Sequence, residues 1–381
     1  MTRSAQFSPC ARSGRATTLE PPSWAALWLP AALLLAALLA PALAQSAQKP
    51  AAPAPGSYSL GAGKVAVYNL AGALVLEPTT GTETVVEVTP GGRDAGRLKF
   101  ATGEAEGRHN LRVLYPEDRV VYPAYGPGSS TSTNVRSDGT FGGKNSSWSS
   151  GRRVKVSGSG GGLEAHADLR VLVPKGADVL VRLMVGDAHI TNVDSKLFVD
   201  IASGSVVTSD TRGGLSIDTG SGDVRVARAN GAVSIDTGSG SVSVNDVSGG
   251  DLVIDTGSGD VDASAVDAPM LSVDTGSGRV DLDEVNAKSV HIDTGSGGVT
   301  IGLKSIIDEL SIDSGSGGIK VSLPRETGAM LSLETGSGGM DVDLPLTSMR
   351  RDHGELRGQL GDGRGRIVIE TGSGGIHIAG R

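Results

Sequence analysis

Apolar and polar residues alternate in short runs along most of the chain, and this two-residue period is typical of β-strands. Between residues 215 and 226, the apolar side chains are Leu215, Ile217, Val224 and Val226, on either side of a Gly-Ser-Gly triplet. The same arrangement returns four more times before residue 302, and no helical period interrupts it. The pattern predicts units of two short strands joined by glycine corners.

The corners share the pentapeptide Asp-Thr-Gly-Ser-Gly or a close relative of it. The full pentapeptide begins at Asp218, Asp236, Asp255, Asp274 and Asp293, and related corners begin at Asp313, Glu334 and Glu370. Successive starts from Asp218 to Glu334 are 18, 19, 19, 19, 20 and 21 residues apart. A unit this short cannot bury a core by itself, so neighbouring units must stack. We therefore predict an all-β fold, a parallel β-solenoid (β-helix) with coils of about 19 residues and two short strands per coil, and an irregular β cap at its N-terminal end.

Each letter of the corner has an expected structural task. The glycines allow positive φ or a close backbone approach. Thr follows the inward apolar residue by two positions, so its hydroxyl is expected to point inward. Asp is expected to point outward, and local hydrogen bonds from the following turn or a cation would offset the repulsion between stacked carboxylates.

The same letters also fit two chemical hypotheses. Asp-Thr-Gly occurs in the active-site loops of aspartic proteases, but that chemistry needs one loop from each of two lobes, not eight loops in tandem. Structural calcium is a better alternative, because aligned carboxylates suit a hard cation. The known calcium-binding nonapeptide, however, places Asp after its glycines, and here Asp precedes them. We expect no cofactor and no dedicated metal site, with structural calcium as the less favoured alternative.

The N-terminal segment predicts export. Residues 1–44 contain Arg3, Arg12 and Arg15, then an apolar run, then Ala42-Leu43-Ala44 before Gln45, which is the pattern of a cleaved signal peptide. The alternative is a membrane anchor, but the apolar run is short. The only cysteine, Cys10, lies in this segment, so we expect no disulfide and no membrane span in the mature chain.

The rest of the chain divides by composition. Residues 45–57 predict a Pro/Ala linker, and 58–115 an irregular β-region that forms the first coils or the cap. Residues 116–152 are rich in Gly, Ser and aromatic residues and predict a long loop. Residues 153–381 predict the solenoid repeats, with a loop inserted near 350–365.

Charge and aromatic residues indicate what the protein could bind. Between Asp200 and Leu344 there are 23 acidic and 8 basic residues, so this part argues against nucleic acid as a partner. The outward charges also have a simpler explanation, since they keep solenoids soluble. Tyr122, Tyr125 and Trp148 in the 116–152 region are candidate ligand contacts for a protein or a glycan, and their alternative role is to pack on the solenoid as a cap. The sequence leaves the oligomeric state open.

No catalytic motif stands out. His109, His166, His189, His291, His353 and His377 are scattered and lack the spacing of a metalloprotease helix, and there is no phosphate-binding loop or nucleophile elbow. We therefore expect a non-enzymatic protein with no catalytic residues. The remaining enzymatic alternative is a carbohydrate-active solenoid, although such enzymes have longer coils and aromatic grooves.

Several of these motifs together resemble one known family. The run LRVLVPKGADVLVRLMVGDAHI at 169–190, the repeated IDTGSGDV units and LGDGRGRIVIETGSGGIHI at 360–378 resemble the bacterial putative-adhesin β-strand-repeat family, a domain of unknown function. The resemblance covers roughly residues 60–381. It implies a β-solenoid and no catalytic residues. The expected function is that of an exported, adhesin-like binding module of the cell envelope or cell surface. The alternative is a periplasmic scaffold in envelope stress or regulation.

Overall fold

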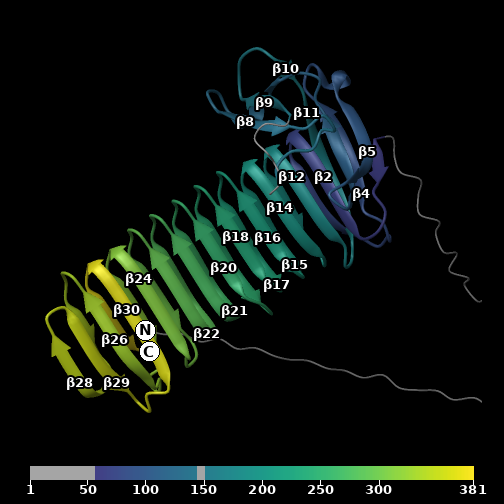
Figure 1. Cartoon of the computed structure of the whole chain (residues 1–381). Coiled ribbons are helices and arrows are strands. Elements are labelled where there is room, and N and C mark those ends of the chain that lie inside the picture. Colours follow the sequence, from purple (N-terminus) through teal and green to yellow (C-terminus); the bar gives the residue numbers. More distant parts are fainter. Residues whose placement is uncertain (1–55, 144–150) are drawn as a thin grey trace, which may run out of the picture. The chain divides into compact units, whose positions relative to one another are not determined.

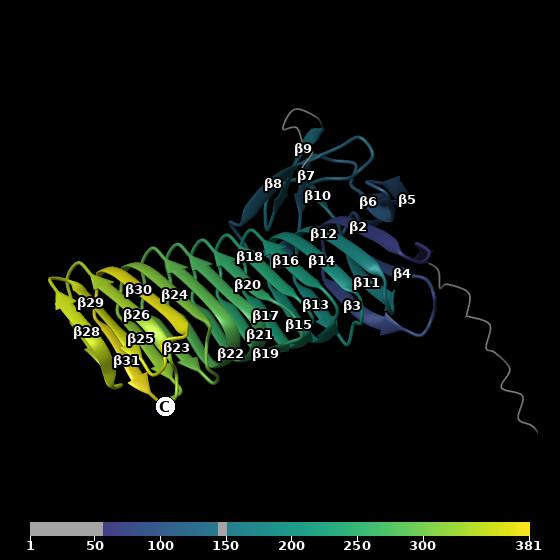
Figure 2. The same ribbon diagram turned by 60° about the horizontal axis from the view of Figure 1, so that its bottom comes forward.

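The computed structural model describes residues 56–143 and 151–381, and these residues form 31 strands and two short 3-10 helices. Most strands lie in two walls of parallel strands that enclose one apolar core (Figures 1 and 2). The predicted all-β solenoid is confirmed. The predicted signal peptide 1–44 and nearly all of the linker 45–57 lie outside the described residues. No helix in the described part of the chain is long and apolar enough to span a bilayer.

Wall A contains the strands that lead into the Gly-Ser-Gly corners. In spatial order it consists of β5 (Lys99–Ala105), β6 (Arg108–Leu114), β2 (Lys64–Ala71), β12 (Asp178–Val185), β14 (Lys196–Ser203), β16 (Leu215–Thr219), β18 (Val233–Thr237), β20 (Leu252–Thr256), the C-terminal parts of β21 (Val261–Thr275) and β22 (Val280–Thr294), β24 (Glu309–Ser316), β30 (Gly365–Ser373), β26 (Ala329–Thr335), β29 (Glu355–Leu360) and β28 (Leu346–Asp352).

Wall B contains the strands that follow the corners. In spatial order it consists of β1 (Ser57–Ser59), β4 (Val85–Gly91), β11 (His166–Pro174), β3 (Leu74–Thr79), β13 (Ala188–Thr191), β15 (Val206–Arg212), β17 (Val224–Asn230), β19 (Val242–Ser248), the N-terminal parts of β21 and β22, β23 (Val299–Leu303), β25 (Ile319–Leu323), β31 (Ile376–Gly380) and β27 (Met340–Val342). The 15-residue strands β21 and β22 run through both walls and join them into one continuous sheet.

The stacking is in register, coil upon coil. Ile217 lies beside Ile235, and Ile235 lies beside Ile254. Identical side chains therefore form inward rows, in which neighbours are about 4.8 Å apart. The corner threonines Thr219, Thr237, Thr256, Thr275 and Thr294 are at most 1% exposed, which confirms the expected inward row of hydroxyls. The core is therefore a stack of repeated layers, and each coil is stabilised by its neighbours.

A close approach between coils explains the second glycine of each corner. At Gly259 the backbone has φ +150°, and a Cβ built there would lie 2.1 Å from the carbonyl oxygen of Gly240 in the preceding coil. The same contact recurs at Gly278 with Gly259, at 2.0 Å. Only glycine lets the corners stack at this distance.

The order of the coils in space differs from their order in the chain at the C-terminal end. β30 pairs with β24 on one side and with β26 on the other, so the last coil lies inside the stack (Figure 1). The segment 350–365, predicted as an inserted loop, is mostly a hairpin of β28 and β29. That prediction is wrong, because β29 pairs antiparallel with β26 and closes the end of wall A.

The segment 116–152 also differs from the predicted loop in its described residues. β7 (Arg119–Val121), η2 (Pro123–Tyr125) and β8 (Ser130–Val135) lie there, and η1 (Ala95–Arg97) precedes them. β7 and β8 join β9 (Arg152–Ser157) and β10 (Leu163–Glu164) in a separate four-stranded sheet in the order β10–β7–β9–β8, named the inserted sheet below. Its inner face buries Val120, Val154 and Val156, so alternation within a Gly- and Ser-rich segment was enough to form strands.

Candidate functional site

The outward face of wall A carries an unbroken row of carboxylates, named the carboxylate ladder. Each side chain lies directly beside the next through the strand register. In spatial order the row consists of Asp200, Asp218, Asp236, Asp255, Asp274, Asp293, Asp313, Glu370 and Glu334. Like charges at this spacing destabilise the sheet.

The carboxylate ladder is bounded at one end by the buried Arg182. Its Nε lies 3.2 Å from Oδ2 of Asp200, and its Nη1 donates to the carbonyl of Phe141 at 3.2 Å. The guanidinium also lies 5.8 Å from the ring centroid of Tyr68. Arg182 thus links Asp200, the first residue of the carboxylate ladder, to Phe141 in the segment that follows β8.

The ladder carboxylates beyond Asp200 are poorly compensated, since among the described residues only Arg182 near Asp218 and His291 near Asp293 oppose the rise in pKa. None of them has an ion pair or a hydrogen bond with any other residue of 56–143 or 151–381. The expected local bonds from the corner are missing because the corner N–H groups are already used: Gly220 N–H donates to Ile201 O and Gly238 N–H donates to Thr219 O, both at 3.0 Å. The carboxylates are left to face solvent and one another.

The pKa values follow from this arrangement. Burial, followed by the neighbouring Asp218 carboxylate, raises the pKa of Asp200 to about 6, although Arg182 opposes the shift. Burial and the adjacent ladder carboxylates also raise the pKa values of Asp218, Asp255 and Asp293. These four carboxylates therefore take up protons at a higher pH than isolated carboxylates do. Structural calcium stays the less favoured alternative that the sequence leaves open.

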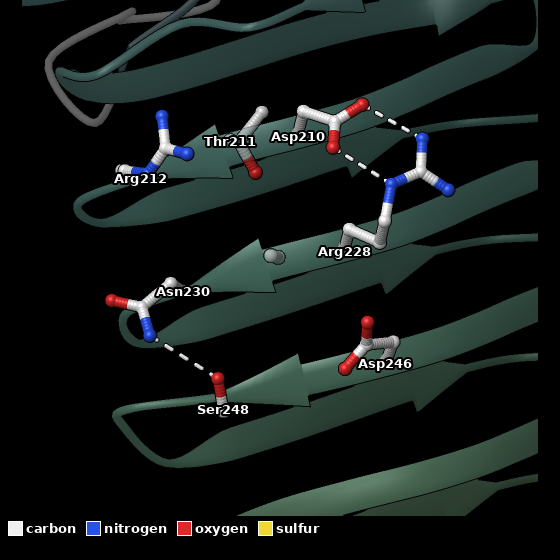
Figure 3. A pocket seen from close by; sticks show the side chains of 8 residues that line it. Asp210, Thr211, Arg212, Arg228, Asn230, Asp246 and Ser248 are labelled. Carbon is white, nitrogen blue, oxygen red and sulfur yellow. Dashed lines mark hydrogen bonds and ion pairs between the residues drawn. The ribbon is translucent and has the colours of Figure 1, made fainter.

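A second polar surface lies on wall B, where each coil bends after its strand. Asp210, Arg228 and Asp246 occupy equivalent positions and adopt positive φ of 56°, 53° and 59°. Arg228 donates to both carboxylate oxygens of Asp210, from Nε and Nη2 at 2.7 Å each, and Asn230 Nδ2 donates to Ser248 Oγ at 3.1 Å (Figure 3). These residues line a recess of about 170 Å³.

Two of the four charged side chains in this recess, Asp210 and Arg228, neutralise each other, whereas Arg212 and Asp246 form no ion pair with another described residue. The bidentate hydrogen bond from Arg228 lowers the pKa of Asp210. It also uses both carboxylate oxygens of Asp210 and two of the N–H groups of Arg228. No nucleophile with a neighbouring base lies among the residues that line it. The recess can donate and accept hydrogen bonds but has no arrangement for acid–base catalysis.

Three comparisons with known proteins bear on this fold. The family model described as Toastrack DUF4097 matches residues 207–379. The part of the chain that matches this model is called the Toastrack domain below. The Toastrack domain spans the regular coils from β15 to β31 and so contains most of the carboxylate ladder and the recess of Figure 3. Its family is one of unknown function, which agrees with the predicted β-strand-repeat family.

The other comparisons add little. A solved structure of a putative cell adhesion protein from Clostridium sporogenes is 13% identical, covers 85% of this chain and 98% of that chain, and has a TM-score of 0.20. A TM-score this low carries no argument about function. No curated protein sequence gives a significant match.

The predicted ligand contacts lie before the Toastrack domain. Tyr122 and Tyr125 are half-buried and pack against the core, and the Tyr122 ring lies 5.1 Å from that of His166. Trp148 lies outside the described residues. The two tyrosines have the packing expected of a cap, and their role in ligand binding stays a prediction.

The structure also brings together one cluster that the sequence did not indicate. Within the Toastrack domain, Asp341 on β27 lies beside His377 on β31, with Asp343 two residues further along. The imidazole Nδ1 is 3.4 Å from Asp341 Oδ2, and Nε2 is 3.7 Å from Asp343 Oδ2. Sequence reasoning missed the cluster because it depends on the pairing of β27 with the last strand. The alternating Asp-x-Asp was the available signal. The three groups are at least partly exposed, and both ring nitrogens face carboxylates, so an ion pair explains them without a metal.

Proposed function

We propose that this protein is an exported, non-enzymatic binding module of the cell envelope or cell surface, similar to an adhesin. The observation that carries the proposal is the outward face of the walls. Side chains repeat coil by coil in straight rows, so that a long surface presents the same groups many times over. Such a surface suits attachment to an extended or repetitive partner more than it suits the chemistry of one substrate.

The composition of the described surface supports this role. The recesses found on wall B and on the inserted sheet are open, and none combines a nucleophile, a base and a group that orients the base. The partner class is a protein or a glycan of the envelope. A carbohydrate-active enzyme remains the less favoured alternative.

Localisation separates the proposal from its main rival. Cells that express the chain from its own N-terminus would be fractionated, and intact cells would be treated with a protease that cannot enter them. Loss of the protein from intact cells supports a surface module. A protein that is protected in intact cells and is released with the periplasm would overturn surface attachment and favour a periplasmic scaffold in envelope stress or regulation.

A further inference from the structure

The inserted sheet has a basic outer face, unlike the acidic coils of the solenoid. Its inner face is fixed by Val120, Val154 and Val156, which are fully buried. Side chains alternate across a strand, so Arg119, Arg153 and Lys155 lie on the opposite face, and all three are exposed. Arg119 on β7 lies directly beside Lys155 on β9, and Lys155 lies beside Ser132 on β8.

These cations line a groove, named the basic groove. It measures about 480 Å³ and is lined by Asp118, Arg119, Ser130, Thr131, Ser132, Arg153 and Lys155. Arg153 donates from Nε and Nη2 to Ser132 Oγ at 3.1 and 2.8 Å, which holds its guanidinium across β8. The groove therefore combines three cationic groups with the hydroxyls of Ser130 and Ser132 on one face of the sheet.

Among the described residues, no carboxylate compensates the charges of the basic groove. No carboxylate of the described residues lies within 4 Å of Arg119, Arg153 or Lys155. The one carboxylate in the lining, that of Asp118, forms an ion pair with Arg152, and the adjacent Glu117 pairs with Arg97 at 2.7 Å. Arg119 and Lys155 are like charges placed directly opposite each other, which costs stability. A chain with net charge −8 has many acidic residues that could have neutralised these cations.

We propose that the basic groove binds an anionic polysaccharide through its carboxylate, sulfate or phosphate groups. Neighbouring strands place Arg119 and Lys155 about 4.8 Å apart, and Arg153 and Lys155 lie about 6.5 Å apart along β9, so the cations can contact more than one anionic group. The hydroxyls of Ser130 and Ser132 lie on the same face as these cations and suit the hydroxyl groups of a sugar. This inference rests on the proposed binding role and names the ligand class for one surface.

Other polyanions fit the groove less well. The lining has no aromatic side chain on which a nucleic-acid base could stack. An acidic peptide that adds a strand would use the edge of β8, whereas the cations stand on the face of the sheet.

The test is direct binding to the purified mature chain by titration calorimetry. The probes are a sulfated hexasaccharide, an oligogalacturonate, a phosphorylated oligosaccharide and a neutral oligosaccharide of the same length. The test variant carries Arg119→Gln, Arg153→Gln and Lys155→Gln. The matched control carries Lys196→Gln, Lys288→Gln and Lys320→Gln, which removes the same charge at exposed positions away from the groove. We expect at least one anionic probe to bind the wild type and the control alike, and the test variant about tenfold or more weakly.

Three results would overturn the inference: binding of the neutral probe with equal affinity, wild-type affinity in the test variant, or an equal loss in both variants. Should the triple variant fail to fold, Arg119→Gln alone answers the question, because this exposed side chain makes no hydrogen bond or ion pair with another described residue. The proposed function is tested separately. A protein that binds anionic sugars but is not at the cell surface refutes the surface role alone, and a surface protein that ignores these sugars refutes only the basic groove.

Discussion

The second corner glycine is required by contact between coils, not by the turn alone. We predict that Gly259→Ala lowers the free energy of unfolding by about 2 kcal/mol or more, since its Cβ would lie 2.1 Å from the Gly240 carbonyl oxygen. Ser258→Ala is the control, because Ser258 is exposed on the same corner. Chemical denaturation monitored by circular dichroism measures both. An equal effect of the two substitutions would show that coils tolerate a Cβ at this contact.

The inward threonines are not equivalent, although they occupy the same row. The hydroxyl of Thr275 is buried without a hydrogen-bond partner, whereas Thr335 Oγ1 donates to Gly374 O at 3.0 Å. We predict that Thr275→Val is neutral or stabilises by up to about 1 kcal/mol, and that Thr335→Val destabilises by about 1 kcal/mol. Melting temperatures of the two variants check this. A loss of stability at both positions would mean that Thr275 has a partner in solution, such as a water molecule.

At the scale of the strand, the carboxylate ladder makes stability depend on pH. The pKa values of Asp200, Asp218, Asp255 and Asp293 are raised in the folded state, so the folded protein binds protons more readily than the unfolded chain does. The ladder's contribution to stability therefore falls as pH rises from about 4 through about 6, and it is most favourable below that window. Carboxylates with lowered pKa values, such as Asp210, act in the opposite direction.

A single neutral residue in the ladder isolates this contribution. Asp255→Asn should raise the free energy of unfolding by about 0.5 kcal/mol at pH 7, because it removes the repulsion from Asp236 and Asp274, and should change little at pH 4. Asp262→Asn is the control, since Arg279 lies 3.7 Å from its carboxylate. Thermal melts of wild type and both variants at the two pH values give the comparison. The same gain at both pH values would exclude ladder repulsion as its cause.

At the scale of the strand, the sequence predicted the features that recur in every coil. It missed the strand pairings between segments that lie far apart in the chain. The inward rows and the corners follow from local alternation and glycine spacing, so the register of Ile217 on Ile235 could be read in advance. The left-handed residue at Arg228 could not, because arginine has no preference for positive φ, although Asp210 and Asp246 in the same row are of a type that tolerates it. The Asp341–His377 cluster and the basic groove depend on strand pairing between distant segments, which carries no short-range signal.

For the whole molecule, the sequence alone could not decide the order of the last coils. The hexapeptide Glu-Thr-Gly-Ser-Gly-Gly occurs at both 334–339 and 370–375, so either strand could stack on β24 by local pattern. The hairpin of β28 and β29 decides the order of these coils. It occupies the outer edge of β26, so β30 pairs with the other edge and lies between β26 and β24. The same hairpin covers the edge that a parallel stack would otherwise expose to another chain.

This order makes the C-terminal strands a link between the coils and the closing hairpin. We predict that deletion of residues 365–381 lowers hydrogen-exchange protection in β26 and β29 about tenfold or more, because β30 and β31 are the parallel neighbours of β26 and β27. Protection in β16 and β18 should persist, since their own neighbours remain. The control replaces 346–360 by a short Gly/Ser loop, which should leave β30 protected through β24. If instead the deletion leaves β26 protected, the coil of β30 and β31 is not needed to hold β26 in the stack, and the predicted link is refuted.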